Sequence, residues 1–194
     1  MAKANEIITI QNSKVSPAHM NVAWVALARS IDETRNATYN TIHCKDGYVA
    51  ATDGARLHVY EQDEDSDLKI PEGAWTILQI TKQMIVLQRK EDDNFPDYWE
   101  QILNYKKEGG QDPKQWSLPW ANYQAKDKHY QSNLATTIKD IFFNARRVFN
   151  ISLLTDALRG MHSPIMEMEE RKGYVVIVDD QHIAVVMPLL GTEF

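Results

Sequence analysis

Residues 51–61 read ATDGARLHVYE, a stretch that predicts two strands joined by a tight turn. Asp53 and Gly54 form the Asp-Gly pair that favours a two-residue hairpin, because glycine adopts positive φ without steric cost. A second Asp-Gly pair stands in Lys45-Asp46-Gly47. Three runs rich in β-branched and aromatic residues flank the two turns: TYNTIHC (38–44), YVAATD (48–53) and RLHVYE (56–61). Together they predict an antiparallel meander.

The first half of the chain also predicts one helix and further strands. EIITIQ at 6–11 favours a strand, and Ser16-Pro17 favours the start of a helix. Apolar residues at helical spacing predict one buried stripe on that helix: Ala23, Trp24, Leu27, Ala28 and Ile31. AWTILQI (74–80) and MIVLQRK (84–90) favour two more strands.

The second half of the chain repeats this order of elements. ATTIKDIFFN (135–144) favours a strand, and ISLLTDALRGMH (151–162) favours a helix capped by Asn150. The apolar side of this helix is predicted to consist of Ile151, Leu154, Ala157 and Leu158. Three strands are expected to follow: PIMEMEE (164–170), YVVIVD (174–179) and HIAVVMPLL (182–190).

This repetition predicts an α+β fold in which two pseudo-repeated strand-helix-strands units pack two helices on antiparallel sheets. We expect a single domain over residues 1–194, with half-repeats at about 1–94 and about 134–190.

Between the half-repeats, residues 99–133 form an aromatic-rich insert with no helical or strand period. Its large aromatic residues are Trp99, Tyr105, Trp116, Trp120, Tyr123 and Tyr130. Aromatics among lysines are typical of a stacking surface for single-stranded nucleic acid. Large side chains of a long loop also pack against the rest of the protein and hold the loop in place, and we favour this second interpretation.

Charge and cysteine content limit the classes of partner and compartment. The formal net charge of -6 gives the whole molecule no long-range attraction for a phosphate backbone. The single cysteine, Cys44, excludes an internal disulfide and suits a reducing compartment. The N-terminal residues lack the apolar core of a signal peptide, and no run of about 18 apolar residues is present. We therefore expect a soluble, cytoplasmic protein.

The sequence contains no recognisable catalytic motif. The six histidines do not show the i, i+4 spacing of zinc hydrolases, and Glu108-Gly109-Gly110-Gln111 lacks the ending of a phosphate-binding loop. The acidic run EQDEDSD (61–67) lacks the glycine and terminal glutamate of an EF-hand, so we interpret it as a solvated loop. A metal-dependent nuclease built on Asp46, Asp53 and His58 is a weaker alternative, because the Asp-Gly pairs already have a turn explanation. We expect no enzyme activity, no cofactor and no metal.

Four segments together resemble, in the same order, signature segments of the bacterial β sliding clamp, the processivity subunit of DNA polymerase III. They are ATDGARL (51–57), FPDYWEQIL (95–103), FNISLLTDAL (149–158) and AVVMPLL (184–190). Residues 18–31 with the following DETRNATYN add a fainter match. Clamp protomers have three tandem domains, each a doubled strand-helix-strands unit. The resemblance therefore implies one clamp-type domain assembled from two half-domains.

The resemblance also implies a binding groove. In the clamp family, the turn that resembles residues 52–57 forms one wall of an apolar groove, and the strand that resembles residues 185–188 forms another. This groove receives short linear peptides of polymerases, clamp loaders and repair proteins. The implied lining here is Thr52, Gly54, Ala55, Arg56, Leu57, Pro96, Val185, Met187 and Pro188. Ala55 and Gln101 replace a histidine and an apolar residue of the family pattern, so we expect a more polar or shallower pocket.

Sliding clamps line their pore with helices that carry Lys and Arg, whose charge meets phosphate without reading bases. The corresponding candidates in this chain are Arg29, Arg35, Arg146, Arg147 and Arg159. Nearby acidic residues leave these regions close to neutral, so we expect DNA affinity to be weak or absent. A ring of six domains would need a hexamer of this chain.

Three functional hypotheses remain open. The first is a clamp-like module for DNA replication or repair, of phage or mobile-element origin, that docks linear motifs of polymerase-associated or clamp-loader proteins. The second is a regulator or decoy that modulates a host replication clamp without encircling DNA. The third is a single-stranded nucleic-acid binder that uses residues 99–133.

Overall fold

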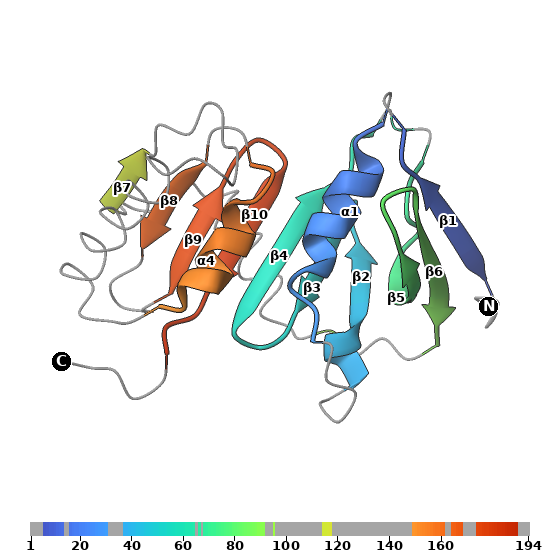
Figure 1. Ribbon diagram of the computed structural model, residues 1–194, viewed down its shortest axis with the longest axis horizontal. Coiled ribbons are helices and arrows are strands. Elements are labelled where there is room, and N and C mark those ends of the chain that lie inside the picture. The colour runs from blue at the N-terminus through green and yellow to red at the C-terminus, as the bar shows by residue number, and fades with distance from the viewer. Residues whose placement is uncertain are drawn as a thin grey trace. The chain divides into compact units, whose positions relative to one another are not determined.

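The chain divides into two compact units, Met1–Asp112 and Pro113–Phe194, and each is described by itself. The computed structural model is drawn in Figure 1. It describes residues 6–13, 16–30, 37–64, 66, 68–91, 95, 114–117, 149–161, 164–168 and 174–189.

The first unit contains antiparallel strands in the order β1-β6-β5-β2-β3-β4. Their bounds are β1 (Ile7–Gln11), β2 (Thr41–Lys45), β3 (Tyr48–Thr52), β4 (Arg56–Glu61), β5 (Gly73–Ile80) and β6 (Met84–Lys90). The two predicted Asp-Gly turns join β2 to β3 and β3 to β4. Positive φ angles at Asp46 (52°) and Gly47 (82°) confirm the two-residue turn between Lys45 and Tyr48. The second turn is longer than predicted, because Thr52 pairs with Leu57 and leaves residues 53–56 between the strands, with Gly54 at φ 86°.

The strand predicted for residues 38–44 is only partly correct. Residues Ala37–Asn40 form a 3-10 helix, η1, and the strand begins at Thr41. The backbone carbonyl of Tyr39 accepts a hydrogen bond from Ser30 N at 2.7 Å. The segment that follows α1 therefore holds Tyr39 by a backbone hydrogen bond, and the strand predicted from the β-rich composition forms only after η1.

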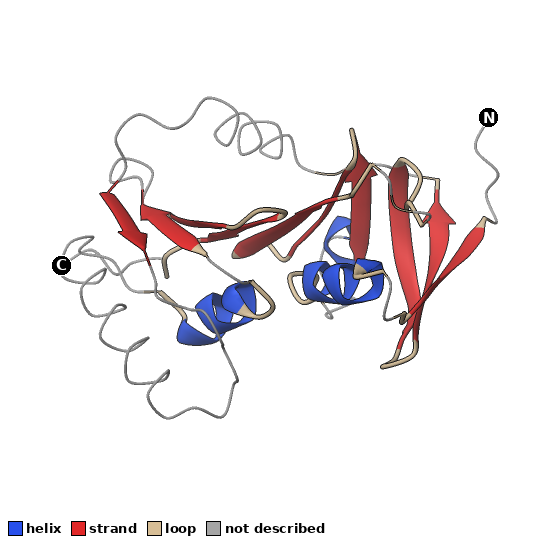
Figure 2. Ribbon diagram, turned by 90° about the horizontal axis from the view of Figure 1, so that it is seen from above, coloured by secondary structure: helices blue, strands red, loops and turns tan. Residues whose placement is uncertain are grey.

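Helix α1 (Ala18–Ala26) lies against one face of the strands of its unit (Figure 2). Ser16 contributes to its start as expected, since Ser16 Oγ accepts from Ala18 N at 3.3 Å. The prediction of a single buried stripe is only partly correct, since Trp24 and Ala28 are buried and Ile31 lies outside the described residues. The helix is buried around most of its circumference, and Ala23 and Leu27 are only half-buried, while Met20 is 64% exposed.

The predicted helix also extended too far. The N–H groups of Leu27 and Ala28 bond to carbonyls three residues back, on Trp24 and Val25, so the last turn tightens and the α-helix ends. His58 on β4 uses the same Trp24 carbonyl, because its Nδ1 lies 3.0 Å from that oxygen. A tertiary contact thus helps to set the helix end.

The core of this unit includes side chains from the helix and from all six strands, among them Val59 of β4 at 1% exposed. Those at most 1% exposed include Ile10, Val22, Val25, Ile42, Val49, Trp75, Ile85 and Leu87. The ends of the acidic loop after β4 are also tied to the core. Gln62 bonds both backbone groups of Ile70, and Cys44 Sγ donates to the Ile70 carbonyl at 3.1 Å.

The second unit contains antiparallel strands in the order β10-β9-β8-β7 and the helix α4 (Ile151–Leu158). The strands are β7 (Lys114–Ser117), β8 (Ile165–Met168), β9 (Val175–Val178) and β10 (His182–Val186). Asn150 caps α4 as predicted, because its Oδ1 accepts from Ser152 N at 2.9 Å. Leu154, Ala157 and Leu158 are buried, as predicted for the apolar side of the helix, and the side chain of Ile151 is outside the part that the structure describes.

The α+β class, with helices packed on antiparallel sheets, is therefore confirmed. Strand β7 lies within the insert 99–133, where the sequence pattern predicted no regular element. This strand forms by antiparallel pairing with β8, a contact that the local sequence does not predict. The strand predicted at 135–144 and the rest of the insert lie outside the described residues, and the single-domain organisation stays a prediction. Neither described α-helix is long and apolar enough to cross a bilayer.

We expect the Cys44 thiol to be unreactive in the folded protein. Burial, with a smaller contribution from the Glu72 carboxylate, raises its pKa from 9.0 to about 12. The fold thus favours the protonated thiol, and this contribution to stability is lost as the pH rises from 9.0 to about 12. Maleimide labelling should require denaturant, and the wild type should lose stability relative to Cys44→Ala over that pH range. Rapid labelling of the native protein would contradict this.

Candidate functional site

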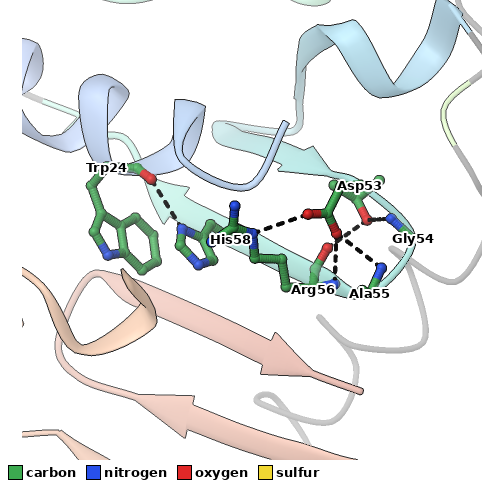
Figure 3. Close-up of polar contacts among 7 residues, drawn as sticks. Trp24, Asp53, Gly54, Ala55, Arg56 and His58 are labelled. Atoms are coloured by element: carbon green, nitrogen blue, oxygen red, sulfur yellow. Dashed lines mark hydrogen bonds and ion pairs between the residues drawn. The ribbon is translucent and has the colours of Figure 1, made fainter. Parts of the chain in front are cut away.

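Hydrogen bonds between side chains and the backbone fix the turn between β3 and β4 (Figure 3). Asp53 Oδ1 accepts from the backbone N–H groups of Ala55 and Arg56 at 2.9 and 3.0 Å. Thr52 Oγ1 donates to the Arg56 carbonyl at 2.6 Å and accepts from Gly54 N at 3.1 Å. These bonds satisfy backbone groups that a turn leaves without strand partners, so the turn is fixed in one conformation.

An ion pair closes the same turn. Asp53 Oδ2 lies 3.2 Å from Arg56 Nε, and the two side chains are 17% and 12% exposed. Because both groups are largely removed from water, the pairing helps to compensate the charge of each. The Arg56 side chain is therefore folded back onto the turn.

A tyrosine ring lies beside the tip of the turn. Gly54 has φ +86°, and a Cβ built on it would lie 3.5 Å from Tyr39 Oη and 3.6 Å from Tyr39 Cζ. Gly54 is exposed and Tyr39 is half-buried. The sequence pattern missed this neighbour because it placed Tyr39 inside a strand, and no local signal indicated the contact.

The β4 side of the turn is anchored to α1. His58 is fully buried, its ring stacks on Trp24 with centroids 4.3 Å apart, and its Nδ1 donates to the Trp24 carbonyl (Figure 3). Leu57, which pairs with Thr52 across the hairpin, is also buried. The base of the turn is thus rigid, whereas Gly54 and Ala55 at its tip are exposed.

In the second unit, the turn between β9 and β10 is held by the same kind of hydrogen bonds from an aspartate side chain. Asp179 Oδ1 accepts from Gln181 N at 3.3 Å and His182 N at 3.0 Å, and it lies 2.9 Å from His182 Nδ1. Val178 pairs with Ile183 just as Thr52 pairs with Leu57. Both half-repeats therefore build this hairpin with an aspartate and a basic side chain three residues later. The sequence pattern located both turns but not the shared bonding.

The predicted groove residues differ in exposure. Thr52, Leu57 and Val185 are buried, Arg56 and Pro188 are half-buried, and Gly54, Ala55 and Met187 are exposed. In the second unit, Met187 (41% exposed) and Leu189 (46% exposed) follow β10. The structure thus brings Thr52–Leu57 together in one turn and places Val185, Met187 and Pro188 along one segment. A single groove formed from both sets stays a prediction.

Pro96, the remaining predicted groove residue, lies outside the described residues, as does Gln101. The residue before it is described. The Phe95 ring stacks on His43 of β2, with centroids 4.9 Å apart and planes 15° apart. Stacking of this kind attaches the start of the FPDY segment to the sheet of the first unit.

Two of the five predicted DNA-facing arginines are described. Arg29 follows α1 and is half-buried, and burial lowers the pKa of its guanidinium. Arg159 caps the end of α4 and pairs with Asp156 at 3.4 Å. Arg35, Arg146 and Arg147 lie outside the described residues. Neither described arginine is therefore a fully solvated, uncompensated cation.

The described ranges contain no group of three His, Cys, Asp or Glu residues placed to hold a metal ion. The nuclease alternative used Asp46, Asp53 and His58. Asp53 is engaged with the turn backbone and Arg56, His58 is buried against Trp24, and Asp46 occupies the β2–β3 turn. Each of these residues therefore has a structural role.

Solved structures of bacterial sliding clamps resemble this chain. Caulobacter crescentus pol III beta superposes with a TM-score of 0.57 at 15% identity, covering 97% of this chain and 68% of that one. The DNA polymerase III subunit beta from Pseudomonas aeruginosa gives 0.53 at 14% identity, covering 97% and 68%. The Helicobacter pylori beta clamp bound to a DNA ligase peptide gives 0.55 at 11% identity, covering 97% and 67%.

This likeness confirms, at the level of the fold, the resemblance carried by the four sequence segments. The chain spans about two thirds of the length of these clamp structures. No protein-family model matches the sequence, and no curated protein matches it. The fold is therefore that of a sliding clamp, recognised through structure.

The Asp53→Ala variant should lose stability because the backbone N–H groups of Ala55 and Arg56 and the Arg56 guanidinium lose their acceptor. We expect a loss of about 1–3 kcal/mol in the free energy of unfolding, measured by urea denaturation. Asp180→Ala is the matched control, since Asp180 is an exposed turn aspartate, and it should change stability by less than about 0.5 kcal/mol. Equal effects of the two substitutions would show that the bonding to Asp53 does not fix the turn.

Proposed function

We infer that this chain is a clamp-like binding module in DNA replication or repair that docks short linear peptides of partner proteins. The proposed groove has the Thr52–Leu57 turn as one wall and Val185, Met187 and Pro188 as the other, with Pro96 nearby. Partners of polymerase or clamp-loader type fit this role. The proposed role is binding without catalysis, and a cytoplasmic location remains a prediction.

The observation that carries this proposal is the combination of a rigid turn with exposed apolar side chains. The turn presents Gly54 and Ala55 on a base fixed by Asp53 and Thr52. A ligand that binds an already ordered backbone gains affinity, because less conformational entropy of the site is lost on binding. Met187, which is exposed and flexible, offers adaptable apolar contact to peptides of different sequence.

The comparison with solved clamps supports the kind of ligand. One of the similar structures is a clamp bound to a DNA ligase peptide. The fold likeness to that clamp extends over 97% of this chain. A linear peptide from a DNA-processing protein is therefore the ligand class to test first.

A second candidate function is regulation of a replication clamp without encirclement of DNA. The two described helices favour it, because neither Ala18–Ala26 nor Ile151–Leu158 contains a lysine or arginine. Non-specific DNA binding draws its affinity from such cations. The single-stranded nucleic-acid hypothesis rests on residues 99–133, which apart from β7 lie outside the described residues, and no observation favours it.

Peptide docking is tested by titrating a fluorescein-labelled form of the DNA ligase peptide and following its anisotropy. We expect saturable binding to the wild type and a loss of about tenfold or more in Met187→Asp, because a carboxylate would replace the apolar contact. Met20→Asp is the matched control, since Met20 is an exposed methionine on α1 and its substitution should leave affinity unchanged. Absence of saturable binding to the wild type would remove the proposal.

Duplex DNA should bind weakly. We expect a dissociation constant above about 10 μM for a short duplex at about 50 mM salt, with little dependence on salt, because few counterions are released. Electrophoretic mobility shifts and light scattering at a series of salt concentrations measure both affinity and oligomeric state. Micromolar binding that weakens steeply with salt would favour a DNA-encircling ring over the regulatory candidate.

A further inference from the structure

The Tyr39 ring lies next to the tip of the β3–β4 turn, and neither the sequence pattern nor the clamp resemblance assigned it a role. The built Cβ of Gly54 would lie 3.5 Å from the tyrosine oxygen and 3.9 Å from Cε2. The ring therefore continues the surface that begins at the glycine backbone. Tyr39 is half-buried, so the residue is partly accessible to solvent.

The backbone that carries this ring is fixed relative to the turn. Tyr39 belongs to η1, which leads directly into β2, and β2 pairs with β3, the strand that ends at Thr52. The Tyr39 carbonyl also accepts from Ser30 N at 2.7 Å, which ties η1 to the segment after α1. Two connections therefore hold the backbone of Tyr39, so a ligand that contacts this residue meets a backbone that is already ordered.

An aromatic ring beside an exposed glycine can contact a ligand that approaches the glycine backbone. Gly54 lacks a side chain, so a ligand can approach the turn closely, and the neighbouring ring then offers an apolar face with a polar edge. Tyrosine in such a setting binds apolar and aromatic side chains at low cost in conformational entropy.

We propose that Tyr39 is a ligand-contacting residue of the peptide groove, whose ring packs against an apolar or aromatic side chain of the docked peptide. This inference rests on the proposed peptide-docking function. It extends the groove from the turn onto η1, in the same unit, and it makes the ring, not the hydroxyl, the determinant of affinity.

Affinity for the fluorescein-labelled DNA ligase peptide tests the inference in two variants. Tyr39→Ala should raise the dissociation constant about threefold to tenfold, whereas Tyr39→Phe, which keeps the ring, should stay within about twofold of the wild type. Tyr48→Ala is the matched control, because Tyr48 is a half-buried tyrosine at the opposite end of β3. Wild-type affinity in Tyr39→Ala, or equal losses in the Ala and Phe variants, would overturn the inference.

Chemical protection gives a second readout that a merely structural role would not change. The buried wild-type thiol, with its pKa raised to about 12, does not compete for maleimide, so a thiol introduced by Tyr39→Cys reports its own accessibility. Saturating peptide should slow labelling of Tyr39→Cys but not of Met20→Cys, which lies at an exposed position on α1. Unchanged labelling of Tyr39→Cys in the presence of bound peptide would overturn the inference.

The outcomes separate this inference from the function on which it rests. If the wild type fails to bind the peptide, the docking function fails. If the wild type and Tyr39→Ala bind equally well, the docking function survives and only the role of Tyr39 is wrong.

Discussion

A hairpin turn leaves backbone N–H and carbonyl groups without partners in the strand ladder, and these groups must be satisfied before the turn can be rigid. In this chain the Asp53 carboxylate and the Thr52 hydroxyl bond the backbone of the next residues, and Arg56 pairs with the carboxylate. The hairpin can then leave Gly54 and Ala55 exposed without disorder. The rest of the proposed site depends on this rigidity, because a mobile turn would offer no fixed wall.

The second unit uses the same aspartate hydrogen bonding in its turn, so the two half-repeats share bonding as well as the order of their elements. Asp179 bonds the backbone of the β9–β10 turn and contacts His182, as Asp53 does with Arg56. The two turns differ where function is proposed. The first has a glycine at φ +86° with a tyrosine ring beside it, whereas Asp180 occupies the corresponding position in the second. The shared bonding supports folding in both units, and the glycine distinguishes the turn proposed to meet a ligand.

Much of the fold could be predicted from the sequence because its signals are local. The Asp-Gly pairs favour turns with positive φ at the glycine, Asn150 caps a helix through its own side chain, and the strands carry β-branched runs. The errors occur where tertiary contacts decide. His58 takes the Trp24 carbonyl near the end of α1, Ser30 holds Tyr39 outside the sheet, and β7 forms by pairing with β8. The resemblance indicated the turn residues of the site, but the Tyr39 contact spans fifteen residues of chain and has no local signature.

The central claim is that the glycine turn and the segment after β10 bind one peptide together. Amide chemical-shift changes in the full-length protein, recorded by NMR during titration with the DNA ligase peptide, test it most directly. The amides of Gly54 and Ala55 and that of Met187 should shift together, with one common dissociation constant. Shifts confined to one of the two segments, or a separate dissociation constant for each, would contradict the claim that they form a single site.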